Sequence, residues 1–287
     1  MSNLDIAERR MPQDGRMSLK LGEKWIDIRV STLPSSFGER LVLRLLDKAD
    51  ASLDLRELGM SDEMTKDYLD QLKSTSGIIL VTGPTGSGKT TTLYSGLNYL
   101  NDQSRNILTV EDPIEYALEG IGQTQVNNKV GLSFAKGLRA ILRQDPDVVM
   151  VGEIRDKETA ETAIQASLTG HLVLSTIHTN DAVGAITRLI DMGVEPYLLA
   201  SSVKMVIAQR LVRKIDDEQK FSGRVGIFEM IKIDNDIKKL INENIDEDSI
   251  RNNAFKKYTS LTKDGENKVK QGVTSDLELK RVLKEVE

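Results

Sequence analysis

The sequence predicts an α/β protein in which a parallel sheet follows a small β-rich module and precedes a helical C-terminal region. In the middle of the chain, short apolar runs alternate with helical patterns, as expected for parallel strands that are buried on both faces. The runs occupy residues 78–81, 106–110, 148–151 and 172–176, and the helical patterns occupy 90–100, 134–143 and 159–168. A cluster of small or ionisable residues directly follows each run, which predicts that all four clusters meet at one edge of the sheet.

The β-rich module is predicted over residues 1–48. Alternating residues from Met17 and again from Trp25 indicate strands, residues 33–38 indicate a loop, and residues 41–46 indicate a further strand. Residues 49–75 are more polar and predict a linker with a helix near 61–72, for which Ser61 is the N-cap. The α/β domain is expected at 76–222 and a helical C-terminal region at 223–287, with helices at 236–242, 246–257 and 275–287.

Composition is that of an ordinary globular protein, with 39% hydrophobic and 29% charged residues. The net charge of −5 argues against nucleic acid as the main partner, because phosphate backbones are bound through an excess of Lys and Arg. The chain has no cysteine, so thiolate metal sites are excluded. It has no apolar run of about 18 residues and no apolar core near its start, so we expect a cytoplasmic protein that does not span a membrane.

The most specific sequence pattern among the four clusters is Gly83-Pro-Thr-Gly-Ser-Gly-Lys-Thr90. It fits the pattern G-x-x-x-x-G-K-[ST] between a strand and a helix. Glycines allow backbone N–H groups to surround phosphate oxygens, and the start of the helix adds its positive dipole end. Lys89 is expected to reach the β and γ phosphates of ATP, and the Thr90 hydroxyl to bind Mg²⁺. The residues expected to bind the nucleotide are Gly83, Pro84, Thr85, Gly86, Ser87, Gly88, Lys89, Thr90 and Thr91.

Two carboxylates at the same edge are candidates for the chemistry. Glu153 follows the run 148–151, where it either holds a Mg²⁺-bound water, polarises the attacking water, or only caps the next helix. Glu111 lies closest to the end of its strand and is the better candidate to orient water, whereas Asp112 and Glu115 are equally explained as loop caps. The pattern leaves open which of Glu111 and Glu153 orients the attacking water.

The two histidines, His171 and His178, bracket the fourth run. A histidine at a strand end is more often structural than functional, but the position of His178 at the phosphate edge favours a role in sensing the γ-phosphate. No third ligand stands at metal spacing, so the sequence predicts no zinc.

The chain resembles the secretion ATPase family of type II secretion and type IV pilus assembly over residues 5–283. Residues 6–16 are similar to the motif at the start of its second N-terminal domain, 111–115 to its aspartate box, 142–156 to its Walker B region and 168–180 to its histidine box. Residues 207–213 and 226–229 also match, and 120–127 are more similar to the type II secretion branch. The resemblance implies a RecA-like P-loop domain behind a β-rich, PAS-like domain.

The same resemblance implies a hexameric ATPase that powers protein secretion at the cytoplasmic face of the inner membrane, with membrane platform proteins as partners. ATP would lie between the β module and the RecA-like domain. Arginines outside the P-loop would complete the site, since a guanidinium binds phosphate bidentately; these are Arg29, Arg44, Arg139 and Arg143. Alternation alone favours solvent-facing positions for Arg29 and Arg44. The remaining alternatives are a pilus extension or retraction ATPase and a nucleotide-dependent assembly switch with little turnover.

The chain departs from the family pattern in two places. The four-cysteine zinc insertion is replaced by residues 214–222, so no zinc can be held there. The family's extra N-terminal domain is missing, because the sequence starts inside the first motif. We therefore expect a truncated or engineered fragment, or a reduced natural form.

Overall fold

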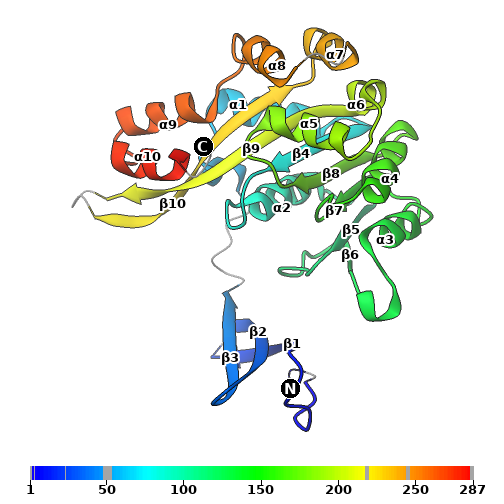
Figure 1. The fold of residues 1–287 in the computed structure, drawn as a ribbon, viewed down its shortest axis with the longest axis vertical. Coiled ribbons are helices and arrows are strands. Elements are labelled where there is room, and N and C mark those ends of the chain that lie inside the picture. The colour runs from blue at the N-terminus through cyan, green and yellow to red at the C-terminus, as the bar shows by residue number, and fades with distance from the viewer. Residues whose placement is uncertain are drawn as a thin grey trace. The chain divides into compact units, whose positions relative to one another are not determined.

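The computed structural model describes residues 2, 4–22, 24–47, 54–216, 220–243 and 246–284. It divides into two compact units (Figure 1). The smaller unit comprises Met1–Ser52 and Ile114–Ala117, and the larger comprises Leu53–Pro113 and Leu118–Glu287.

The smaller unit is a three-stranded antiparallel sheet in the order β1-β2-β3. Its strands are β1 (Gln13–Leu21), β2 (Lys24–Ser35) and β3 (Gly38–Asp47). The side-chain period of two buries Ile28 and Val30 on one face. The predicted loop at 33–38 is largely strand, because Pro34 and Ser35 pair with the start of β3 and only two residues are left to turn the chain.

The larger unit is built on a seven-stranded sheet in the order β10-β9-β4-β8-β7-β5-β6 (Figure 1). Its strands are β4 (Gly77–Thr82), β5 (Ile107–Glu111), β6 (Gly122–Gln125), β7 (Val148–Val151), β8 (Leu172–Ile177), β9 (Val203–Ile215) and β10 (Phe221–Lys232). All neighbours pair in parallel except β9 and β10. The predicted α/β class with a parallel sheet is therefore confirmed, and every residue of β4, β7 and β8 is buried.

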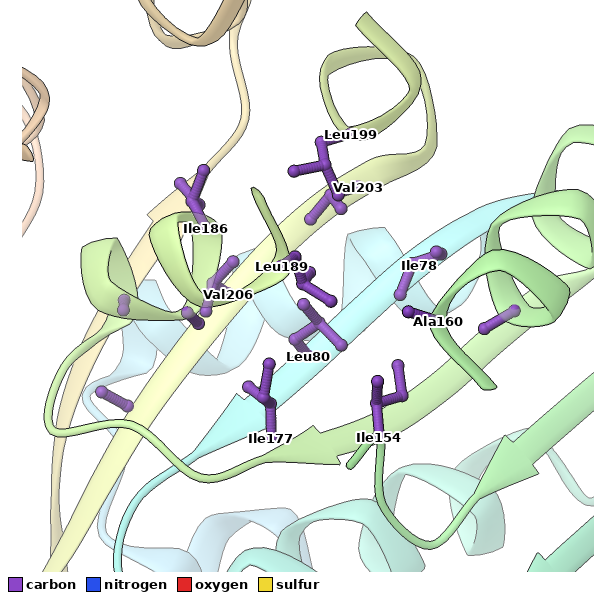
Figure 2. Close-up of a cluster of buried hydrophobic side chains, with 14 of the residues drawn as sticks. Ile78, Leu80, Ile154, Ala160, Ile177, Ile186, Leu189, Leu199, Val203 and Val206 are labelled. Carbon is purple, nitrogen blue, oxygen red and sulfur yellow. The ribbon is translucent and has the colours of Figure 1, made fainter. Parts of the chain in front are cut away.

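Helices cover both faces of this sheet. They are α2 (Lys89–Leu100), α3 (Phe134–Ile141), α4 (Lys157–Leu168), α5 (Ala182–Asp191) and α6 (Pro196–Ser202). Figure 2 shows Leu80 of β4 beside Leu189 of α5, and Ile78 of β4 beside Ala160 of α4, in the hydrophobic core on one face. Ile79 and Val81 alternate to the other face, where α2 packs against β4 and β8.

The predicted helix before the sheet is α1 (Asp62–Leu72), and the side chain of Ser61 caps it by accepting a hydrogen bond from the backbone N–H of Met64 at 3.2 Å. Residues 54–75 differ from the predicted linker because Tyr68 and Leu72 are fully buried and the segment packs within the larger unit. The Tyr68 hydroxyl donates to the carbonyl of Thr92 in α2.

The C-terminal region begins differently from the prediction of a helical region at 223. Residues up to 232 form β10, because the apolar stretch around Ile227 and Phe228 completes the sheet beside β9. Four helices follow within the described residues: α7 (Asn235–Asn242), α8 (Glu247–Ala254), α9 (Leu261–Lys270) and α10 (Asp276–Lys284). Among the described residues, every helix is too short or too polar to cross a bilayer.

Candidate functional site

The glycine-rich loop leaves the end of β4 and leads into α2. Gly83, Gly86 and Gly88 have φ angles of 146°, 80° and 90°, which side-chain-bearing residues rarely adopt. At Gly83 a Cβ atom would lie 2.4 Å from the carbonyl oxygen of Gln209, so the neighbouring strand also requires glycine. At Gly86, by contrast, a Cβ atom would meet nothing within 4 Å, which leaves this turn of the loop open toward a ligand.

Lys89 is folded back onto the loop. Its Nζ donates hydrogen bonds to the carbonyls of Gly83 at 2.8 Å and Pro84 at 2.9 Å. Burial lowers the pKa of Lys89 to about 8, the charge of Arg210 acts in the same direction, and the carboxylate of Glu153 opposes both. A buried ammonium held only by carbonyls gains strongly from a multiply charged anion, which is what a nucleotide triphosphate provides.

Glu153 follows β7 and is 9% exposed. Its Oε1 lies 2.5 Å from a guanidinium nitrogen of Arg155, and its Oε2 lies 3.5 Å from Nε2 of His178. Oε2 is buried and has no hydrogen-bond partner among the described residues. Because an unsatisfied buried carboxylate oxygen is costly, it is a ready acceptor for a water or a ligand of a hard cation.

His178 lies between this carboxylate and the loop. Burial lowers the pKa of His178, as do the charges of Lys89 and Arg155, while Glu153 and a hydrogen bond with the backbone of Gly83 oppose the shift. The imidazole is therefore neutral at neutral pH and can act as a hydrogen-bond donor or acceptor. His171 is distant from this arrangement along β8, and its Nδ1 lies 2.8 Å from the carbonyl of Ala166 at the end of α4.

Glu111 stands at the end of β5, which two strands separate from β4. Its carboxylate is 3% exposed and accepts hydrogen bonds from the hydroxyls of Tyr94 and Thr109 and from Nε2 of Gln123. The side chains of Glu153, His178 and Lys89 thus form one electrostatic group, and Glu111 belongs to a separate hydrogen-bonded group nearer the sheet edge formed by β6.

The candidate arginines occupy two different places. Arg29 and Arg44 are directly opposite each other on β2 and β3 of the smaller unit, and Arg16 is opposite Arg29 on β1. Like charges directly opposite destabilise a sheet, so this row is a suitable place for an anion.

Arg139 and Arg143 lie at and beyond the C-terminal end of α3, close in sequence to the amino end of β7. Arg139 is exposed and pairs with Glu158 at 2.8 Å. Glu158 lies in the first turn of α4, which follows the carboxyl end of β7, so this ion pair holds Arg139 toward that edge of the sheet.

Arg210, which is 3% exposed on β9, was not among the site residues predicted from the sequence. It donates to the carbonyls of Asn180 at 2.6 Å and Gln209 at 3.0 Å, and it abuts Gly83 so closely that a Cβ there would lie 3.0 Å from its NH1. The available signal was a charged residue inside the apolar run 205–212, since a buried charge in a strand is usually paired or functional.

Residues that suit Mg²⁺ are present at this edge. The Thr90 hydroxyl is in the first turn of α2, and Oε2 of Glu153, which accepts no hydrogen bond from the described residues, is an oxygen donor of the kind that hard cations prefer. No group of three or more His, Asp or Glu side chains is placed to hold a metal ion within the described part of the chain. This donor set fits a cation that is held mainly by water and by a nucleotide's phosphates.

The fold and the loop define a P-loop nucleotide-binding protein with a RecA-like sheet. The chain belongs to the type II/IV secretion system protein family, whose model matches residues 1–287. It is 54% identical to type II secretion system protein E of Pseudomonas aeruginosa and 52% identical to type II secretion system ATPase E of Vibrio cholerae. Each alignment covers 99% of this chain and 64% of the relative, so the chain spans less than two thirds of the length of these proteins.

Solved structures of ATPases share the fold. The crystal structure of the pilus retraction motor PilT with bound ADP is similar with a TM-score of 0.80 and 33% identity, covering 95% of this chain and 77% of that one. The ATPase DotB of Legionella pneumophila is similar with a TM-score of 0.77 and 25% identity, covering 94% of this chain and 77% of that one.

Proposed function

We propose that this chain binds Mg²⁺–ATP at the carboxyl edge of the larger unit and hydrolyses it as a motor of type II protein secretion. One observation carries the proposal. Lys89, Glu153 and His178 follow three different strands and meet beside a glycine-rich loop, and Oε2 of Glu153 has no hydrogen-bond partner among the described residues. The relatives named as type II secretion proteins support the choice of process.

Each residue of the site has a separate role in phosphoryl transfer. Backbone N–H groups of the loop and Lys89 bind the β and γ phosphates and stabilise the charge that develops on them. A bound Mg²⁺ supplies further charge neutralisation there, and Thr90 and Glu153 are the residues that would hold it. Oε2 of Glu153 accepts a hydrogen bond from the attacking water and orients it, and neutral His178 donates to the γ-phosphate. Glu111 contributes a second carboxylate to the same edge.

Several subunits share each site in this proposal, and six is the number that the family resemblance implies. Arg139 and Arg143, at and beyond the end of α3, complete the nucleotide site of a neighbouring copy in this proposal. Arg29 and Arg44 place two positive charges directly opposite each other, which favours phosphate as their partner. The assembly would act in the cytoplasm at the inner membrane, together with the membrane proteins of the secretion platform.

A pilus motor is the second candidate, and the similarity to PilT favours it. The sequence identity to type II secretion system protein E is 54%, whereas the identity to PilT is 33%. We therefore prefer a motor of type II secretion to a pilus motor. Pull-down of inner-membrane proteins from cells that contain both machineries separates the two candidates, because each predicts a different set of captured partners.

Phosphate release from Mg²⁺–ATP tests the proposal. The wild type is expected to hydrolyse ATP, with specific activity that rises with protein concentration if subunits share sites. Lys89→Ala should abolish hydrolysis while the fold survives, since the side chain pairs with phosphate rather than packing in the core. Lys73→Ala is the matched control, because Lys73 is exposed and its ion pair with Asp70 at 3.9 Å contributes little. A Lys89→Ala variant with the wild-type rate would contradict the assignment.

A further inference from the structure

A carboxylate that is buried without a cation partner is unusual and needs a reason. Glu111 is such a group, since all of the hydrogen bonds described for it come from neutral side chains. Thr109 donates to Oε1 at 2.5 Å, Gln123 donates to the same oxygen at 3.0 Å, and the Tyr94 hydroxyl donates to Oε2. An ionised carboxylate accepts about four hydrogen bonds, so this arrangement leaves room for about one more donor.

Tyr94 joins this carboxylate to the nucleotide loop. It lies on α2 four residues after Thr90, so both side chains are on the same face of the helix, one turn apart. The tyrosine is fully buried, and its hydroxyl spans from α2 to the end of β5. A displacement of the helix that carries Lys89 and Thr90 would therefore be transmitted to Glu111 directly.

Gln123 fixes the other side of the carboxylate. Its Nε2 donates to Glu111 and lies 3.3 Å from the Tyr94 hydroxyl, while its Oε1 accepts the backbone N–H of Leu118 at 2.7 Å. The amide thereby ties the carboxylate to the loop that follows Pro113 and leads to β6. Thr109, two residues earlier on the same strand, also donates to this carboxylate. Any other rotamer of Glu111 would therefore lose several of these hydrogen bonds.

We propose that Tyr94 and Gln123 are positioning residues that fix the carboxylate of Glu111 at the carboxyl end of β5, with one acceptor position for a water beside the reacting phosphate. The inference rests on the proposed function. It adds which residues hold the carboxylate of Glu111 and that one of them, Tyr94, lies on α2. A purely structural role for the cluster makes a different prediction. It would lower stability on mutation and leave the contribution of Glu111 to catalysis unchanged.

The test is a double-mutant cycle on ATP hydrolysis with Tyr94→Phe and Glu111→Gln. Loss of a hydrogen bond to a charged group is expected to lower kcat by about tenfold in Tyr94→Phe. The KM for ATP should stay within about twofold, because the phosphate-binding loop is intact. In the Glu111→Gln background, Tyr94→Phe should change kcat by less than about twofold, since residues that act as one unit are not additive.

Tyr68→Phe is the matched control. Tyr68 is equally buried and its hydroxyl also bonds to α2, at the carbonyl of Thr92, but it makes no bond to Glu111. This variant should lose stability and keep its kcat. Gln123→Met is a second test if Tyr94→Phe does not fold. It should show the same fall in kcat and the same dependence on Glu111. Thermal unfolding of every variant identifies losses of activity that come from misfolding.

Three results would overturn the inference: an unchanged kcat in both Tyr94→Phe and Gln123→Met, an equal fall in kcat with and without Glu111, or a rise in KM in place of the fall in kcat. An inactive wild type would overturn the proposed function, and this inference with it, whereas an active wild type with additive variants would overturn this inference alone.

Discussion

Glu229 makes the stability of the larger unit dependent on pH. The residue lies on β10, is 3% exposed, and accepts the backbone N–H groups of Ala182 at 2.9 Å and Leu261 at 3.3 Å, at the starts of α5 and α9. Burial raises the pKa of Glu229 to about 7, and the negative charge of Asp181 adds to the shift. The two backbone hydrogen bonds and the positive charge of Arg251 oppose it.

The sign and size of the effect follow from this shift. The ordinary value is 4.5, so between pH 4.5 and 7 the folded protein binds a proton that the unfolded chain has released. Stability is therefore lost as pH rises through that window, and the loss is complete above pH 7. A difference of about 2.5 units corresponds to about 3 kcal/mol, of which about 2.5 kcal/mol falls between pH 5 and pH 8.

Chemical denaturation of the wild type and Glu229→Gln at a series of pH values measures this contribution. Glutamine keeps the shape and carries no charge, so its stability relative to the wild type should rise by about 2.5 kcal/mol from pH 5 to pH 8. Glu243→Gln, at an exposed position after α7, controls for the loss of a negative charge. A stability difference between Glu229→Gln and wild type that does not change with pH would refute the reasoning.

Three further predictions address other parts of the chain. Ser61→Ala removes the N-cap of α1 and should lower the free energy of unfolding by about 1 kcal/mol in a denaturant titration, without changing nucleotide binding; an unchanged midpoint would contradict the capping role. Arg29→Ala and Arg44→Ala should each reduce ATP hydrolysis, by about 10³-fold if they act as arginine fingers, and weaken nucleotide binding much less. Wild-type rates in both variants would exclude the β module from the chemistry. Metal analysis of protein prepared without chelator and without added zinc should find no stoichiometric zinc, because the sequence has no thiolate and two histidines do not make a structural site; one zinc per chain would refute this.

The sequence was sufficient for features that depend on neighbouring residues. Runs of buried apolar residues predicted β4, β7 and β8, because a strand in the middle of a parallel sheet needs apolar side chains on both faces. The spacing of glycines and Lys89 predicted the loop, and Ser61 predicted the start of α1. In each case the determining residues lie within about ten positions of one another.

Features that depend on partners far along the chain were not predictable in this way. The residues of β10 were expected to belong to a helical region. This expectation was wrong because their strand conformation depends on pairing with β9. The surroundings of Glu111 include Tyr94, 17 residues away, and Gln123, 12 residues away, on separate elements. The contact of Arg210 with Gly83 similarly follows only from the adjacency of β9 and β4.

The most direct test of the proposed chemistry is the comparison of Glu153→Gln with the wild type in two assays. Glutamine keeps the size of the side chain but cannot orient water as a carboxylate does. Binding of a fluorescent ATP analogue without Mg²⁺ should stay close to that of the wild type, because the loop and Lys89 are untouched. Phosphate release from Mg²⁺–ATP should fall by about 10²-fold or more. Hydrolysis at the wild-type rate with normal binding would contradict the central claim that Glu153 activates the attacking water at this site.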